Sequence, residues 1–224
     1  MLPPSARLIY CSYPTLATYL WLPPNGHRPK GVFLFIGTCY SASMNELLNI
    51  TIDSIRKRGL ILILTRDRAY KSKTDLIANL ILKGSLFVVS GDEWLPSFLL
   101  PRIIRRQTTE IKETMDRLRT VRAATCYRLL DSLTNIDSKG EPILVLEFLH
   151  TFYDPDIPLR VRLLKLRECC RELKRLAFYR PVIVMTQAMP VDDYEKFSPA
   201  LYSIADKTLT LEPELESISQ PALF

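Results

Sequence analysis

Histidine and closely spaced cysteines are scarce in this 224-residue sequence. Its two histidines, His27 and His150, are too few for a metal site built on imidazole. Its five cysteines include no CxxC pair, which argues against zinc and against the disulfide framework of a secreted protein. We therefore expect no metal site and a reducing, intracellular compartment, either the cytoplasm, the nucleoid or the nucleus.

Long hydrophobic runs are also missing. No segment reaches the ~18–20 continuous apolar residues that a membrane-spanning helix needs. The N-terminus has no charged start followed by a long apolar core, so it does not read as a secretion signal. With 47% hydrophobic and 24% charged residues the composition is typical of a globular protein, and we expect no membrane partner.

What the sequence does have is a series of short apolar runs that alternate with segments of helical period. Four of the runs are apolar almost throughout, as strands covered on both faces are in parallel sheets. The run "TLTLE" (208–212) alternates instead and predicts an edge strand. The order predicts an α/β fold, namely a three-layer, doubly wound, mostly parallel sheet with helices on both faces. The other runs are 31–36, 60–64, 86–89, 143–147 and 182–186.

Helices are expected between these runs. Ser43 and Glu46 form a capping box, which predicts a helix that begins at Ser43 and stops at Gly59. We divide the chain into an N-terminal arm or short strands (1–30), a core (31–212) and an acidic, flexible tail (213–224). Further helices are predicted over 75–82, 110–133 and 159–178, the last ending before an Arg-Pro pair.

The order of these elements resembles the RecA/RadA/KaiC group of P-loop ATPase cores over roughly Gly31 to Glu212. Five pieces carry the resemblance because they follow one another as the family's motifs do. They are "GTCYSASM", "RKRGLILILTRD", "ILVLEFLHTFYD", "LLKLRECCRELKRLAFYRPVIVMTQ" and "IADKTLTLE". The resemblance implies a RecA-like core.

The phosphate-binding motif of that family, G-x-x-x-x-G-K-[ST], is degenerate here. Counted from Gly37, the loop includes Ser41, and Ala42, Ser43 and Met44 replace the second glycine, the lysine and the Ser/Thr. Serine cannot supply the ammonium group, and a thioether is a poor ligand for magnesium. We therefore expect no ATP or magnesium cofactor and no ATPase activity at this vestigial loop, which could equally be an ordinary strand-to-helix turn.

Other positions of the family's site are partly kept, as the resemblance implies. Glu147 takes the place of the Walker B acid, Asp67 that of the catalytic glutamate and Gln187 that of the γ-phosphate sensor. Each is also explained as an ordinary polar residue at a strand end. The alternative is an atypical ATPase that binds and slowly hydrolyses nucleotide, with Lys71 or a residue of a partner protein replacing the missing lysine.

Positive charge is concentrated in two segments. Eight Arg and Lys face three acids in Arg102–Arg128, for a net +5, and eight face two in Arg160–Arg180, for a net +6, whereas the whole chain is only +6. Concentrated charge of this kind indicates nucleic-acid binding, although two solvated helix faces would read the same way. The candidate nucleic-acid-binding residues are Arg102, Arg105, Arg106, Arg171, Lys174 and Arg175.

The N-terminal arm is rich in aromatic residues. Tyr13, Tyr19 and Trp21 are candidates for the contact through which RecA-like protomers join, or they cover the protein's own sheet edge. The favoured hypothesis is a non-catalytic RecA-like paralogue that serves as a structural or regulatory partner in DNA recombination or repair. Its partner would be another RecA-family protein, in a hetero- or homo-oligomer, with DNA as a further candidate. A protein-interaction module with no nucleic-acid role is the remaining alternative.

Overall fold

The computed structural model describes residues 39–42, 58–65, 70–91, 98–136, 140–187 and 194–211. The arm (1–30), the strand expected over 31–36, most of the helix expected after Ser43, and the tail (213–224) lie outside these described residues.

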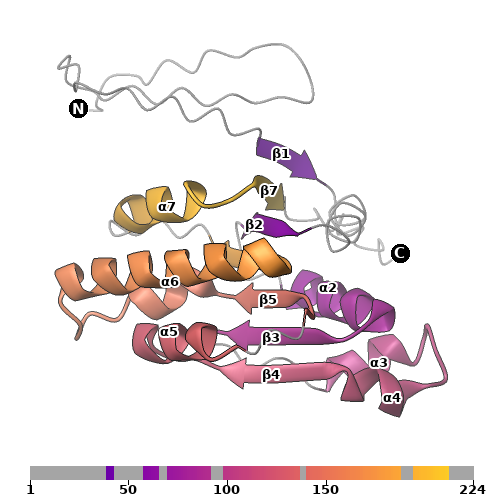
Figure 1. Ribbon diagram of the computed structural model, residues 1–224. Coiled ribbons are helices and arrows are strands. Elements are labelled where there is room, and N and C mark those ends of the chain that lie inside the picture. The colour runs from indigo at the N-terminus through magenta and orange to yellow at the C-terminus, as the bar shows by residue number, and fades with distance from the viewer. Residues whose placement is uncertain are drawn as a thin grey trace, which may run out of the picture.

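Seven strands form one sheet in the order β1-β7-β2-β6-β5-β3-β4, and every neighbouring pair is parallel (Figure 1). The apolar runs predicted from the sequence form β2, β3, β5, β6 and β7, which confirms those strands. β6 is the middle strand of the seven, and β2 lies beside it in the interior of the sheet, flanked by β6 and β7. The strand bounds are β1 (Cys39–Ala42), β2 (Gly59–Thr65), β3 (Leu86–Ser90), β4 (Leu118–Arg122), β5 (Ile143–Leu146), β6 (Pro181–Gln187) and β7 (Lys207–Leu211).

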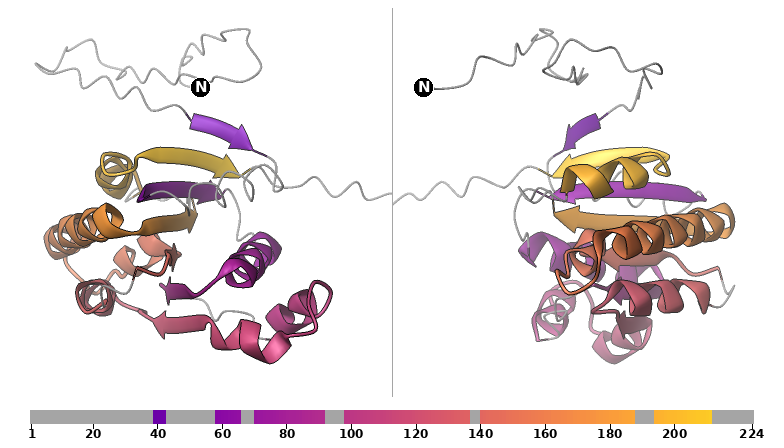
Figure 2. Two further views of the ribbon diagram at one scale, coloured as in Figure 1. Left: turned by 45° about the vertical axis from the view of Figure 1, so that its right-hand side comes forward. Right: turned by 90° about the vertical axis from the view of Figure 1, so that its left-hand side faces the viewer.

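Helices cover both faces of the sheet, so the predicted three-layer α/β fold is confirmed (Figure 2). Along β2, Leu62 packs in one core and Ile63 in the other, as alternating strand side chains must. One face carries α2 (Tyr70–Lys83), α3 (Leu99–Ile104) and α4 (Ile111–Asp116). The other carries α5 (Cys126–Thr134), the 3-10 helix η1 (Phe148–Phe152), α6 (Leu159–Tyr179) and α7 (Tyr194–Tyr202).

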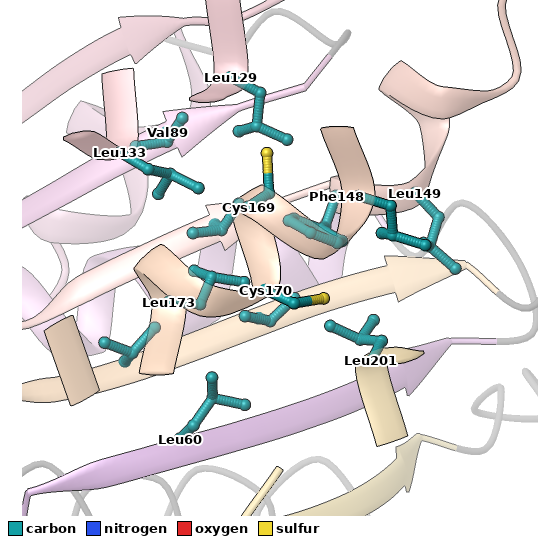
Figure 3. Packing of buried hydrophobic residues seen from close by; sticks show 14 of the residues in the cluster. Leu60, Val89, Leu129, Leu133, Phe148, Leu149, Cys169, Cys170, Leu173 and Leu201 are labelled. Carbon is teal, nitrogen blue, oxygen red and sulfur yellow. The ribbon is translucent and has the colours of Figure 1, made fainter. Parts of the chain in front are cut away.

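The long helix α6 shows how the sequence builds one of these layers. Leu166, Cys169, Cys170 and Leu173 are buried and recur at helical spacing, so they form the stripe that faces the core. The thiol of Cys169 points toward Leu129 of α5, whereas that of Cys170 points toward α7 (Figure 3). Burial raises the pKa of both thiols, that of Cys170 to about 12, so both act as small core residues rather than reactive groups.

The helix predicted over 110–133 is wrong. The chain there forms α4, the edge strand β4 and α5 in succession. β4 carries the β-branched residues Thr120 and Val121 and pairs with β3, and this tertiary pairing prevails over the helical periodicity. Thr125 then begins α5, because its hydroxyl accepts a hydrogen bond from the backbone N–H of Arg128.

Two predictions about the opposite end of the sheet are also wrong. β7 is not an edge strand, since it lies between β1 and β2. Its alternation arises because Leu209 and Leu211 are buried under one helical layer while Thr208 and Thr210, which alternate with them, are half-buried. The new neighbour β1 lies in the stretch that was expected to form a loop, with Ser41 opposite Thr210 and Ala42 opposite Leu211.

Candidate functional site

The carboxyl edge of the sheet is the natural place for a site. Because the strands are parallel, their carboxyl ends share one edge. β2 continues into α2 on one face, whereas its neighbour β6 is followed by α7 on the other face. The connections that follow the neighbouring strands β2 and β6 therefore run on opposite faces of the sheet. Open α/β sheets bind ligands at such a topological switch point.

A buried ion pair lies at this edge. Lys73, in the first turn of α2, donates from Nζ to the carboxylate of Glu147, the residue that follows β5. Only 6% of the lysine side chain and 8% of the glutamate side chain are exposed. Burying two charges is costly unless each satisfies the other, so the pair fixes the start of α2 against the end of β5.

The backbone at Glu147 is unusual. It is left-handed, with φ 51° and ψ 42°, and Glu147 is the one such non-glycine residue in the described part of the chain. Gly91, at the end of β3, lies against it. A Cβ at residue 91 would come within 2.4 Å of the Glu147 carbonyl oxygen, and the Gly91 N–H donates to Leu146 O at 2.8 Å. The glycine therefore allows the close backbone approach that sets the position of Glu147.

Uncharged polar groups end the two central strands. Thr65, the last residue of β2, is 1% exposed, and its hydroxyl has no hydrogen-bond partner among the described residues. The alternation along β2 puts Thr65 on the face that α2 covers. On β6, the Thr186 hydroxyl accepts from the Leu149 N–H at 3.3 Å, and half-buried Gln187 ends the strand. A buried hydroxyl without a protein partner is a group that a ligand or water can satisfy.

This geometry draws attention to a motif that the sequence analysis missed. The segment after β2 reads "RDRAYKSKT", in which Lys73 and Thr74 are the K-[ST] of the phosphate-binding pattern. Counting back, Asp67 and Ser72 take the two glycine positions. Thr74, the residue that follows Lys73, is fully buried. The signal in the sequence is a Lys-Thr pair near the start of a helix that follows an apolar strand, and the glycine that matches the motif, Gly37, lies on an earlier segment of the chain.

The residues that were predicted for the site therefore lie in different places, and some of them are not described by the structure. The stretch 37–44 was predicted to be a vestigial phosphate loop or an ordinary strand-to-helix turn, but backbone pairing with β7 makes Ser41 and Ala42 part of the strand β1. Gly37, Ser43, Met44 and Asp67 lie outside the described residues. Glu147 and Gln187 do lie at the carboxyl edge. The lysine that contacts Glu147 is Lys73, whereas the side chain of Lys71, which was named from the sequence as a substitute for the missing lysine, lies outside the described part of the structure.

The candidate nucleic-acid-binding residues do not form one patch. Arg102 lies in α3, and Arg105 and Arg106 follow it, all exposed on the α2–α4 side of the sheet. The second group lies on α6, which covers the opposite face of the sheet (Figure 2). Its members Arg171, Lys174 and Arg175 are exposed. The aromatic residues of the arm, Tyr13, Tyr19 and Trp21, lie outside the described residues.

Comparison of the chain with protein-family models and with curated protein sequences finds no match. Among the helices that the structure describes, none combines the length and apolar character needed to cross a membrane. Nor do any three His, Cys, Asp or Glu side chains within the described ranges gather closely enough to hold a metal ion.

Proposed function

We propose that this chain is a RecA-like protein that binds the phosphates of a nucleotide beside Lys73, and that it acts as a structural or regulatory partner in DNA recombination or repair rather than as an ATPase. One observation carries the nucleotide part: a lysine in the first turn of the helix after the interior strand β2 meets the carboxylate of the residue that follows β5. The role in recombination rests on the resemblance to the RecA/RadA/KaiC group.

The residues present fit a phosphate in part. The start of α2 offers backbone N–H groups and a partial positive charge, and Lys73 offers an ammonium group. Thr74 and Glu147 are oxygen donors of the kind that magnesium prefers, and such an ion, when bound, would neutralise phosphate charge. Asp67 and Ser72, however, replace the glycines that let the backbone approach phosphate closely.

The buried ion pair also explains why binding should be weak. To contact phosphate, the Lys73 ammonium must share or leave the Glu147 carboxylate, which holds it in the ligand-free protein. A charge-assisted hydrogen bond adds about 1.5–3 kcal/mol, and part of that is lost when an existing partner is released. We therefore expect a Kd weaker than about 0.1 mM, equivalent to less than about 5.5 kcal/mol of binding free energy.

Titration of the full chain with a fluorescent ATP analogue, with and without magnesium, tests this proposal. Lys73→Met alone would leave a buried carboxylate without its cation, so the informative variant is Lys73→Met/Glu147→Met, which removes both charges. Lys83→Met, at the exposed end of the same helix, is the matched control. The double variant should fold and lose binding while the control keeps it. Absence of binding by the unmodified chain at millimolar analogue, or equal binding by both variants, would overturn the proposal.

A second candidate, a partner protein that binds no nucleotide, is favoured by the absence of both glycines from "RDRAYKSKT". In that case Lys73 and Glu147 only hold α2 on the sheet. The same titration separates the two candidates, because a purely structural pair predicts no signal with any variant.

A further inference from the structure

A groove between α6 and α7 carries a concentration of positive charge that the carboxyl-edge site does not use. The groove has a volume of about 540 Å³ and is lined by residues of α6 and of the segment from α7 to Ile204. Its floor includes Cys170 of α6 and Ala200 and Ile204 from the α7 side. Its rim is basic and consists of Arg167, Arg171, Lys174 and Arg175.

Most of this charge is not neutralised by the protein. α6 contains two acids, and both are engaged on the helix itself: Glu168 with Lys165 at 2.7 Å and Glu172 with Arg175 at 2.6 Å. Arg167, Arg171 and Lys174 are exposed and have no ion pair within the described part of the chain. Three cations on one rim thus face solvent, and an anionic partner is the chemistry that complements them.

The arrangement of these cations suits a chain of charges rather than a single anion. Arg167, Arg171 and Lys174 follow the i, i+4, i+7 spacing that keeps residues on one helix face. Successive cations are therefore separated by roughly one helical turn, about 5.4 Å along the axis. A polyanion whose charges recur along its backbone can contact all three at once.

Aromatic rings continue the same stripe. Phe178 lies four residues after Lys174, so it falls on the same helix face, and 69% of its surface is exposed. Tyr179 beside it is 58% exposed, and the two ring centroids are 5.1 Å apart in an edge-to-face arrangement. Large exposed aromatics at the end of a basic groove supply what unpaired bases need, since every base can stack on a ring while its phosphates follow the cations.

We infer that the α6–α7 groove binds single-stranded nucleic acid, with Arg167, Arg171 and Lys174 on the phosphates and Phe178 stacked against a base. An acidic protein segment would satisfy the cations but gives no role to the exposed rings as a stacking surface, so nucleic acid is the better fit.

Fluorescence anisotropy with a labelled oligothymidylate and the full chain tests the groove. The variant is Arg167→Gln/Arg171→Gln/Lys174→Gln, and the matched control is Arg102→Gln/Arg105→Gln/Arg106→Gln, which removes the same charge from the opposite face of the sheet. The groove variant should flatten the log Kd against log salt slope by about 2, from about 0.7 for each lost phosphate contact. Equal losses in the two variants, or none in the groove variant, would overturn the inference.

Phe178→Ala separates stacking from charge. It should weaken oligothymidylate binding about 5- to 150-fold, as the loss of one base–aromatic stack does, with the salt slope unchanged. Polyglutamate and a duplex of the same length are the competing probes. If either binds more tightly than oligothymidylate and responds to the groove variant, the single-strand inference is wrong. The Lys73→Met/Glu147→Met variant should bind oligothymidylate normally, which keeps this test independent of the nucleotide site.

Discussion

Lys73 at the carboxyl edge and Lys174 on the outer face of α6 carry the same charge in opposite surroundings. Lys73 has 6% of its side chain exposed and is held by the Glu147 carboxylate, whereas Lys174 is exposed on the rim of a groove. A cation that is paired with a carboxylate of the same chain influences the stability of the fold even when no ligand is bound. A cation left to solvent contributes chiefly when a partner binds, so the two regions should respond differently to the same substitutions.

The largest difference should appear in stability. Lys73→Met leaves the Glu147 carboxylate buried without a cation and should lower the free energy of unfolding by about 3–5 kcal/mol. Lys174→Met should change it by no more than about 0.5 kcal/mol, because an exposed side chain with no partner is removed. Urea denaturation of both variants measures the difference, and equal losses would break the comparison.

Removing both charges should restore most of that loss. Lys73→Met/Glu147→Met replaces a buried ion pair by apolar side chains, a change that is often neutral or stabilising. Its unfolding free energy is therefore expected to lie closer to the unmodified protein than to Lys73→Met. A double variant as unstable as the single one would mean that the carboxyl edge needs these side chains for more than mutual neutralisation.

The backbone contact behind Glu147 should be the next most sensitive point. Gly91→Ala puts a methyl group 2.4 Å from the Glu147 carbonyl and should cost about 1–3 kcal/mol, as overpacking does. Gly84→Ala is the control, since nothing lies within 4 Å of a Cβ there, and it should leave stability unchanged or raise it by up to about 1 kcal/mol. Thermal unfolding compares the two variants, and a harmless Gly91→Ala would show that Glu147 can move.

The two regions should also differ in how strongly their interactions depend on salt concentration. Raising the salt from about 50 to about 500 mM shortens the screening length, which acts on exposed charges much more than on buried ones. The coupling between Lys73 and Glu147, measured by a double-mutant cycle in urea, should change by less than about 0.5 kcal/mol, while oligothymidylate affinity should fall steeply. A strongly salt-dependent coupling would mean that water reaches the ion pair.

The smallest expected effect on stability at neutral pH comes from the ionisation of the buried thiols of Cys169 and Cys170, the second of which lines the groove. Burial raises the pKa of Cys170 to about 12 and that of Cys169 above its usual range of about 9. A raised folded pKa means that the unfolded chain loses these protons first, so the stability they contribute is intact below about pH 9 and is lost as pH rises toward 12. Unfolding midpoints at pH 8 and 11 should therefore diverge less in Cys170→Ala than in the unmodified protein, and an equal divergence would argue against this source of alkaline instability.

The sequence predicted the parts of the fold whose signal is local. Continuous apolar runs such as Leu60–Leu64 and Val182–Thr186 became the central parallel strands, and the period of α6 fixed its buried face. β4 could not be predicted in this way, because its exposed residues copy a helical pattern and only pairing with β3 makes it a strand. The candidate site at Lys73 was missed for a related reason. Glu147 was found at its strand end, but its partner Lys73 is 74 residues away, and only the order of the strands brings the two together.

Glu147 also joins the two regions compared above. Its left-handed backbone lets one residue serve both sides of the sheet: its carboxylate meets α2 on one face, while the chain it begins, η1, packs on the other. Phe148 then touches Phe152, whose ring lies 6.2 Å from that of Phe197 in α7. Glu147, Phe148, Phe152 and Phe197 thus form a continuous path of neighbouring residues from Lys73 to α7, one of the two helices beside the basic groove.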